Sequence, residues 1–356
     1  MASLARLLTL ATAVSALPQK PEGGRHGRGF RYLGRVNPET RELTWPATGI
    51  EYTYFGSSED APVSDVTGTN SINIAVDDGA PMTIDNFSGS AITPANGSLE
   101  NHSVEIRKKS EALYGSIFLG DPQTIDTAGL VGRPRKNMEI IGDSISCGYG
   151  IEGTFPCTQT ADVEDGTSTY GALTAEAIDA AYSIVAWSGK GLIRNTVSAE
   201  PNQPLMPELW TRYGANDPDN SYPFDVPMDI VVINLGTNDF SYTLYYDNGT
   251  SYAARPEITE PQFANATIEF GKRVQSKYPQ AEMFLLSSPM LSGPQHTTQS
   301  NALIEAVGQL GPKAHFVNIP PQDRTAVGLG CDYHPSSAEH EVMAEILTSA
   351  IQEVCG

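Results

Sequence analysis

The stretch Ile140-Ile141-Gly142-Asp143-Ser144-Ile145-Ser146 decides the fold class, because an apolar run gives way at once to a glycine and small polar residues. Short continuous apolar runs are typical of strands that are buried on both faces of a parallel sheet. A serine at the tight turn after such a strand can expose its hydroxyl group, but serine is also a favoured helix N-cap. The stretch alone leaves both roles open for Ser144.

Apolar runs and helical segments alternate from residue 136 to the end of the chain. The predicted strands are Met138–Ile141, Tyr182–Ala186, Asp229–Asn234, Glu282–Ser287 and His315–Ile319. Helices are expected near Tyr170–Ala181, Gln262–Lys277 and Gln299–Leu310, and a last helix has an apolar face from Val342 to Val354 and a capping box at Ser336 and Glu339. Five strands with interleaved helices predict a three-layer α/β domain with a five-stranded parallel sheet over residues 136–356.

Residues 30–125 have a different pattern, with short alternating runs between turn-forming clusters. Examples of these runs are Arg31–Leu33, Ile50–Phe55, Ser71–Val76 and Val104–Arg107. Such runs predict an antiparallel β-sandwich domain in front of the α/β domain.

The first 29 residues have the features of a targeting sequence and a linker rather than of either domain. Residues 1–16 combine one arginine, a short apolar run and a small-x-small ending at Ala16, which predicts a signal peptide and a secreted chain. Residues 17–29 are rich in proline, glycine and basic residues, and we expect them to be mobile. In a secreted chain, the Asn-x-Ser/Thr sequons would mark glycosylated surface positions; they are Asn86, Asn96, Asn101, Asn248 and Asn265.

The composition excludes several kinds of partner. The chain has 356 residues, with 22 Lys and Arg against 42 Asp and Glu, and therefore a net charge of −20. This balance argues against nucleic acid or an anionic membrane, since phosphate binding needs clustered Lys and Arg. No His, Cys and carboxylate cluster has the spacing of a zinc site, so we expect neither a metal nor another cofactor.

In a secreted chain the four cysteines can oxidise. Cys147 and Cys157 are ten residues apart across a loop rich in glycine and proline, and this spacing predicts a disulfide between them. Cys331 and Cys355 flank the last helix, which is about 27 Å long. A bridge across its ends would require a long fold-back, so we do not expect that pair.

Three further blocks follow later segments of the α/β region. Gly189 lies in Trp187-Ser188-Gly189-Lys190-Gly191, where a backbone N–H could approach a ligand closely, although the block could be an ordinary turn. Asn238 lies in Gly236-Thr237-Asn238-Asp239; its amide could donate to an oxyanion or form an Asx-turn. His334 lies in Cys331-Asp332-Tyr333-His334-Pro335, where it could take a proton from a serine or be a surface residue.

Two common serine-hydrolase patterns do not fit these blocks. The elbow Gly-x-Ser-x-Gly is absent, because its fifth position is Ser146. A chymotrypsin-like order needs a catalytic histidine upstream of the serine. The histidines upstream of Ser144 are His26 and His102, and neither lies in a segment that suits a catalytic base.

The order of the four blocks resembles the SGNH (GDSL) hydrolase superfamily. The motifs are most similar to those of carbohydrate esterase family 2, and they follow a β-rich domain in the sequence. They are Gly-Asp-Ser-Ile-Ser-Cys-Gly-Tyr-Gly, Trp-Ser-Gly-Lys-Gly and Asp-Tyr-His-Pro. That resemblance implies a jelly-roll domain before an SGNH domain and the removal of acetyl groups from polysaccharides. It makes Ser144 the nucleophile and His334 the general base. It also assigns the oxyanion hole to the N–H groups of Ser144 and Gly189 and the side chain of Asn238.

One position departs from the superfamily pattern Asp-x-x-His, because the residue three before His334 is Cys331. Asp332 is two before. In an extended segment the side chains at i and i+2 share a face, and the residue before Pro335 is pushed toward extended backbone. We therefore expect the carboxylate of Asp332 to meet Nδ1 of His334 and complete a triad, with a Ser–His dyad as the alternative.

Together these features predict a secreted, monomeric acetylesterase that acts on acetylated plant cell-wall polysaccharide. One alternative is a lipase or phospholipase of the same superfamily, which would need an exposed apolar patch near the site. A second alternative is a glycan-binding protein without catalysis, which the presence of all four blocks disfavours.

Overall fold

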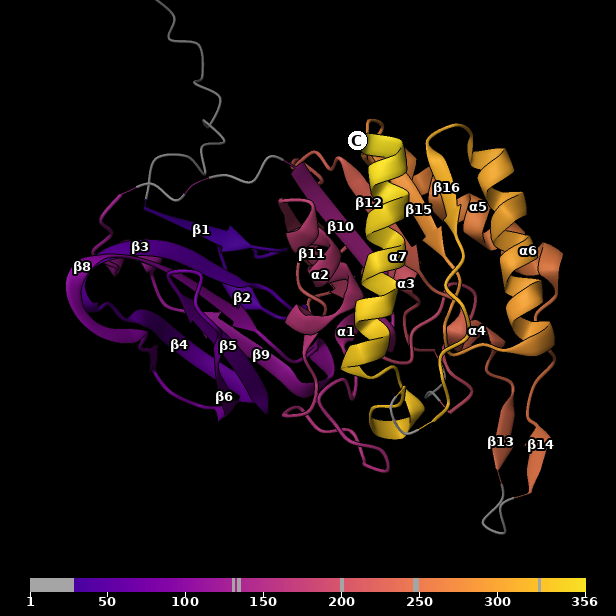
Figure 1. The fold of residues 1–356 in the computed structure, drawn as a ribbon, viewed down its shortest axis with the longest axis horizontal. Helices are drawn as coiled ribbons and strands as arrows, with labels where there is room; N and C mark the ends of the chain where they lie inside the picture. The colour runs from indigo at the N-terminus through magenta and orange to yellow at the C-terminus, as the bar shows by residue number, and fades with distance from the viewer. Residues whose placement is uncertain (1–28, 130–131, 133–135, 199–201, 246–249, 326–327) are drawn as a thin grey trace, which may run out of the picture.

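The structure is a computed structural model that describes residues 29–129, 132, 136–198, 202–245, 250–325 and 328–356 (Figure 1). The side chains of residues 95–97 are not described. The segments that the sequence predicts to be a signal peptide and a mobile spacer lie outside the described residues, apart from Gly29.

The N-terminal part of the chain folds into two antiparallel sheets, as expected. One sheet contains, in spatial order, β1 (Phe30–Leu33), β3 (Gly49–Ser58), β8 (Ala95–Lys108), β5 (Asn70–Val76) and β6 (Met82–Phe87). The other contains β2 (Glu42–Leu43), β9 (Gly115–Leu119), β4 (Ala61–Gly68) and β7 (Ala91–Ile92). Alternate residues such as Ile50, Tyr52 and Tyr54 of β3 are buried between the sheets, which explains the alternating sequence pattern.

The C-terminal part is built on a parallel sheet that confirms the five predicted strands. Its spatial order is β11 (Ala180–Ala186), β10 (Lys136–Gly142), β12 (Ile230–Asn234), β15 (Glu282–Leu286) and β16 (Ala314–Val317). Gly142 pairs with Ala186 on one side and with Asn234 on the other, so three strands end at the same level. Ligand sites in open parallel sheets form at this edge.

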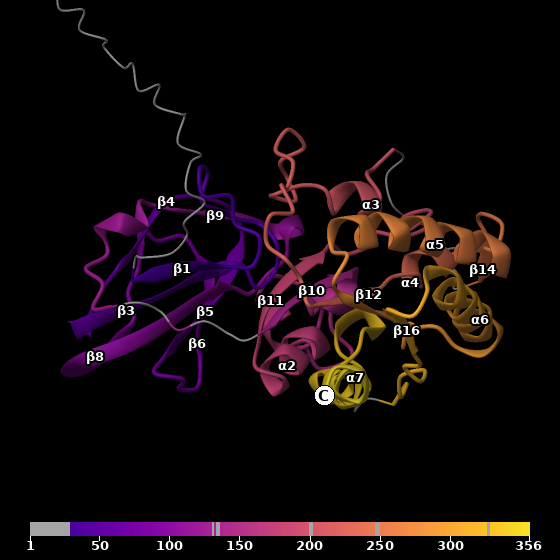
Figure 2. The same ribbon diagram turned by 90° about the horizontal axis from the view of Figure 1, so that it is seen from above.

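Helices cover both faces of the parallel sheet (Figures 1 and 2). The helices are α1 (Ser144–Cys147), α2 (Tyr170–Ala177), α3 (Met206–Leu209), α4 (Thr237–Phe240), α5 (Glu260–Lys277), α6 (Gly293–Leu310) and α7 (Ser337–Cys355). Ile140 packs with α2 and α7, whereas its neighbour Ile141 packs with α5 and α6. The sheet is therefore apolar on both faces, which is why its strands are continuous apolar runs.

The remaining elements are short. The 3-10 turns are η1 (Ala112–Tyr114), η2 (Pro122–Thr124), η3 (Gly166–Ser168) and η4 (Cys331–Tyr333), and β13 (Thr243–Tyr245) and β14 (Ser251–Ala253) form a hairpin. Helix α6 begins six residues before the predicted Gln299, because Ser292 precedes a Gly-Pro start that admits a helix N-terminus.

A buried ion pair joins the sandwich to the parallel sheet. Arg35, which follows β1, donates three hydrogen bonds to the Glu139 carboxylate in β10, with N···O distances of 2.9–3.1 Å. Its guanidinium also lies 4.0 Å from the centre of the Tyr222 ring. In Figure 2 the sandwich lies against the β11 side of the sheet. Within the described part of the chain, the helices are too short or too polar to cross a bilayer.

Candidate active site

Ser144 lies at the turn where β10 passes into α1. Asp143 caps this helix, and its Oδ1 accepts a hydrogen bond from the N–H of Ile145 at 3.1 Å. The turn requires a glycine at residue 142, because a Cβ there would lie 2.0 Å from Oγ of Ser146. The tight turn holds the Ser144 side chain at the carboxyl edge of the sheet, where it is 5% exposed.

His334 reaches the same edge from the segment before α7. Its Nε2 lies 2.8 Å from Oγ of Ser144, which is hydrogen-bonding distance for a base and a nucleophile. Desolvation lowers the pKa of His334 to about 4, so the imidazole is neutral and able to accept a proton at neutral pH. The ring of Tyr149 lies against the imidazole, with 4.2 Å between ring centres. The geometry thus pairs a hydroxyl with a neutral base.

The partner of the other imidazole nitrogen is a carbonyl group, and here the expected triad is wrong. Nδ1 of His334 lies 3.2 Å from the backbone oxygen of Asp332. The Asp332 carboxylate points elsewhere and accepts hydrogen bonds from the Tyr149 hydroxyl at 3.0 Å and the Gln159 N–H at 3.1 Å. The segment is a 3-10 turn in which Asp332 has φ 48°, so the face-sharing of an extended strand does not apply.

The disulfide joins Cys157 to Cys331, and the predicted Cys147–Cys157 bridge is wrong. Cys147 is buried in α1 as a free thiol. Cys355 is also free. This agrees with the expectation that the length of the last helix prevents a bridge between Cys331 and Cys355. The bridge forms because two loops that are 174 residues apart in sequence meet beside the site, with a Cα–Cα distance of 4.8 Å. It tethers the loop that carries His334.

Two backbone N–H groups of the expected oxyanion hole are available as donors at the carboxyl edge of the sheet. Within the described residues, the N–H groups of Ser144 and Gly189 have no protein acceptor. Gly189 has φ 77°, a backbone conformation that glycine adopts without strain, and its carbonyl accepts from the N–H of Thr196 at 2.7 Å. These two N–H groups are free to bind an anionic oxygen.

Asn238 also lies at this edge, in α4, but both protons of its amide are engaged. Its Nδ2 donates to the Lys190 carbonyl at 2.8 Å and to Oδ2 of Asp143 at 3.2 Å. Burial raises the pKa of Asp143 to about 7. Asn238 can donate to an oxyanion only if the longer of these bonds, to Asp143, opens.

Asp239 is a residue of the site region to which our sequence analysis assigned no role. Its buried carboxylate accepts backbone hydrogen bonds from Leu192, Ile193 and Arg194 at 2.6–3.1 Å. It therefore fixes the loop after Gly191. The signal available in the sequence was its place directly after Asn238 at a strand end. Tyr149 was missed too, and no spacing rule points to it.

Among the described residues, the ligand atoms that are grouped closely enough to hold a metal ion belong to Glu111, Cys147 and Glu164. This group is distinct from the Ser144–His334 pair.

A nucleophile, a neutral base and free N–H donors at the carboxyl edge of a three-layer α/β domain define an SGNH-type hydrolase. The sequence matches the GDSL-like Lipase/Acylhydrolase family over residues 140–342 and the Carbohydrate esterase 2 N-terminal family over residues 32–134. A carbohydrate esterase family 2 enzyme with a carbohydrate-binding domain, from Corynascus thermopiles (Myceliophthora fergusii), is 47% identical. The comparison has a TM-score of 0.82 and covers 91% of this chain and 98% of that one. The chain belongs to carbohydrate esterase family 2 within the GDSL-like hydrolases.

Other relatives agree with this assignment. A family two carbohydrate esterase from Clostridium thermocellum in complex with cellohexaose is 29% identical, with a TM-score of 0.79 over 91% of this chain and 98% of that one. The Cellulase/esterase CelE of Acetivibrio thermocellus is 32% identical over 92% of this chain, and this chain spans 40% of that protein's length. An acetylxylan esterase / glucomannan deacetylase of Cellvibrio japonicus is 29% identical, over 90% of this chain and 87% of the relative.

Proposed function

We propose that this protein is a secreted carbohydrate acetylesterase that removes O-acetyl groups from plant cell-wall polysaccharide through an acyl-enzyme on Ser144. The observation that carries the proposal is the 2.8 Å contact between Oγ of Ser144 and Nε2 of a neutral His334. Two N–H groups at the same edge of the sheet, those of Ser144 and Gly189, have no protein acceptor among the described residues. The names of the relatives support the substrate class, since one is an acetylxylan esterase / glucomannan deacetylase and another is in complex with cellohexaose.

In the first half of the reaction, Oγ of Ser144 attacks the acetyl carbonyl carbon as its proton passes to Nε2 of His334. The Asp332 carbonyl, 3.2 Å from Nδ1, holds the imidazolium in place. The N–H groups of Ser144 and Gly189 bind the oxygen that becomes negative, and Asn238 joins them when its bond to Asp143 opens. The bond from the acetyl carbon to the sugar oxygen then breaks, and His334 returns the proton to that oxygen.

In the second half, water attacks the acetyl group on Ser144 while Nε2 of His334 takes a proton from the water. The ester bond to Ser144 breaks, the proton on His334 passes to Oγ, and acetic acid leaves and ionises to acetate in solution. Every step uses side chains and backbone groups of this chain.

Two features of the described surface support a glycan in the site. Tyr333 is 61% exposed, stands next to His334, and lies 4.8 Å from the Phe155 ring between ring centres. Aromatic faces of this kind pack well on sugar rings, which are apolar on their C–H faces. The net charge of −20 suits a neutral glycan better than an anionic lipid surface.

The direct test is acetate release from acetylated xylan and acetylated glucomannan by the wild type and by Ser144→Ala. Ser146→Ala is the matched control, because Ser146 lies in the same helix and its hydroxyl pairs with Tyr170 at 2.8 Å. We expect release by the wild type and Ser146→Ala and none by a folded Ser144→Ala. No acetate release from either polymer, together with hydrolysis of long-chain lipid esters, would replace the proposal with a lipase.

Secretion and glycosylation form a separate part of the proposal. The Asn86, Asn101 and Asn265 side chains are exposed, so these sequons are accessible for modification. Asn248 and the side chain of Asn96 lie outside the described residues. Expression of the full chain in a eukaryotic host should give protein in the medium that starts near Leu17 and carries glycans removable by an endoglycosidase. Retention of the chain with residues 1–16 intact would contradict secretion. Size-exclusion chromatography of the same protein tests the expected monomer.

A further inference from the structure

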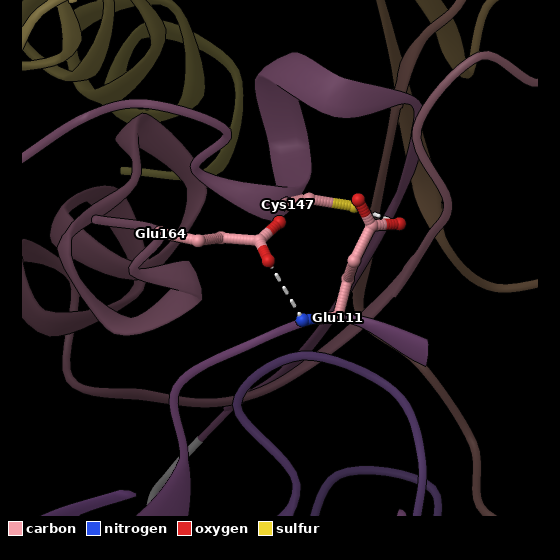
Figure 3. Close-up of side chains that lie close together, drawn as sticks. All are labelled: Glu111, Cys147 and Glu164. Atoms are coloured by element: carbon pink, nitrogen blue, oxygen red, sulfur yellow. Dashed lines mark hydrogen bonds between the residues drawn. The ribbon is translucent and has the colours of Figure 1, made fainter. Parts of the chain in front are cut away.

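A buried polar cluster lies where the sandwich meets the hydrolase domain. Glu111 follows β8, Cys147 ends α1, and Glu164 precedes η3 (Figure 3). All three side chains are fully buried, and their ligand atoms lie within 4.8 Å of one another. Burying two carboxyl groups is costly unless charge and hydrogen bonds compensate for the lost water.

Most of that compensation comes from within the cluster. The buried ammonium group of Lys108 donates to the backbone carbonyl of Glu111 at 2.9 Å and attracts both carboxyl groups. Glu164 accepts from the N–H of Glu111 at 3.1 Å. Burial raises the pKa of Glu164 well above its usual value, and the negative charge of the nearby Glu111 carboxylate raises it further. Burial also raises the pKa of Glu111, while its hydrogen bond from Ser188 and the charge of Lys108 oppose the shift.

One carboxyl oxygen of Glu111 contacts the loop that contains Ser188 and Gly189. Its Oε2 accepts from the backbone N–H of Ser188 at 2.8 Å and lies 3.6 Å from the Cys147 sulfur. Ser188 immediately precedes Gly189, whose N–H is one of the two expected oxyanion donors that have no protein acceptor among the described residues. The Gly189 N–H belongs to the peptide between Ser188 and Gly189. The bond from Ser188 holds the peptide before it, and the bond from Thr196 to the Gly189 carbonyl holds the peptide after it.

We propose that Glu111 is a positioning residue for the oxyanion hole: its carboxylate holds the Ser188 N–H and so aims the Gly189 N–H at the reacting oxygen. Glu111 comes from the end of the sandwich, so that domain completes the hydrolase site rather than only preceding it. The inference rests on the proposed function, because it concerns the oxyanion hole of that reaction.

The expected size of the effect follows from the donor it controls. Loss of a whole oxyanion donor lowers kcat by about 10²–10³-fold. Glu111→Ala keeps the Gly189 N–H but removes the contact that orients it, so we expect kcat to fall by about 10–100-fold. The change in KM should stay within about 2-fold, because the lost interaction belongs to the transition state. Glu111→Gln keeps an oxygen that can accept from Ser188 and should retain most of the activity.

The experiment measures kcat and KM on p-nitrophenyl acetate, whose leaving group needs no glycan site, for the full chain and its variants. Asn73→Ala is the control for loosening of the domain junction. Its side chain donates across the same junction to Asp165 at 3.1 Å and Thr167 at 2.9 Å, and has no link to Ser188. Thermal unfolding and circular dichroism confirm that each variant is folded.

We expect a kcat loss for Glu111→Ala, near wild-type kcat for Asn73→Ala, and rescue in Glu111→Gln. If Glu111→Ala does not fold, Glu111→Asp takes its place, since its shorter side chain cannot span the 2.8 Å bond to Ser188. Wild-type kcat in a folded Glu111→Ala, or equal kcat for Glu111→Asp and Glu111→Gln, overturns the inference. A wild type that does not hydrolyse p-nitrophenyl acetate would instead overturn the proposed function.

Discussion

Replacement of Asp332 by asparagine separates a Ser–His dyad from a triad in this enzyme. The carboxylate of Asp332 does not contact His334, whereas its backbone carbonyl lies 3.2 Å from Nδ1 and is kept in any variant. Asparagine is the suitable replacement because residue 332 has φ 48°, a region that asparagine tolerates and that costs alanine about 1 kcal/mol. An asparagine oxygen can also still accept from Gln159 or Tyr149.

The expected loss in kcat for Asp332→Asn is less than about 10-fold, because the tautomer and orientation of His334 are set by the carbonyl. A carboxylate that itself holds the base behaves differently: its replacement by asparagine lowers kcat by about 10⁴-fold. Steady-state kinetics on p-nitrophenyl acetate and acetylated xylan, with His334→Ala as the reference for complete loss, distinguish these outcomes. A loss of about 10³-fold or more in a folded Asp332→Asn would refute the dyad.

Three further predictions concern pH, stability and the thiols. The acid limb of kcat/KM should lie near pH 4 rather than 6.5, because His334 must be neutral to act as a base and its pKa is lowered to about 4. A pH–rate profile checks this, and an acid limb near pH 6.5 would contradict it. Arg35→Met should lower the free energy of unfolding in denaturant melts by about 3–5 kcal/mol, because it leaves Glu139 buried without its partner. Arg31 forms a partly exposed ion pair with Glu51, and Arg31→Met should lower the free energy of unfolding by less than about 1 kcal/mol. Equal losses would count against the buried pair. Thiol titration of the denatured, unreduced protein should find two free thiols, and peptide mapping should recover a Cys157–Cys331 bridge; any other pairing would contradict the structure.

The sequence was most informative where a local pattern sets local structure. The strand that ends at Gly142 is an apolar run because both faces of the sheet are covered, and the glycine is required by a contact with Ser146 four residues later. The alternation in β3 reflects a strand with one face on the core of the sandwich. In both cases the burial that shapes the element is visible in the spacing of its own residues.

The sequence was least informative where distant loops meet. Cys157 and Cys331 approach only after the whole domain has folded, so their spacing of 174 residues carries no signal. The i, i+2 rule failed at Asp332 because the chain turns there instead of extending. Glu111 has no motif around it, and its contact with Ser188 depends on how the two domains pack.

The central claim, that Ser144 is the acylated nucleophile, is tested most directly by intact-protein and peptide mass spectrometry after rapid acid quenching of the enzyme with excess p-nitrophenyl acetate. The account predicts one acetyl group per chain, on the peptide that contains Ser144, and no acetylation of that peptide in Ser144→Ala. His334→Ala should form the adduct far more slowly, because the proton of Oγ then has no acceptor at 2.8 Å. Acetylation at another residue, or full turnover by a folded Ser144→Ala, would contradict the account.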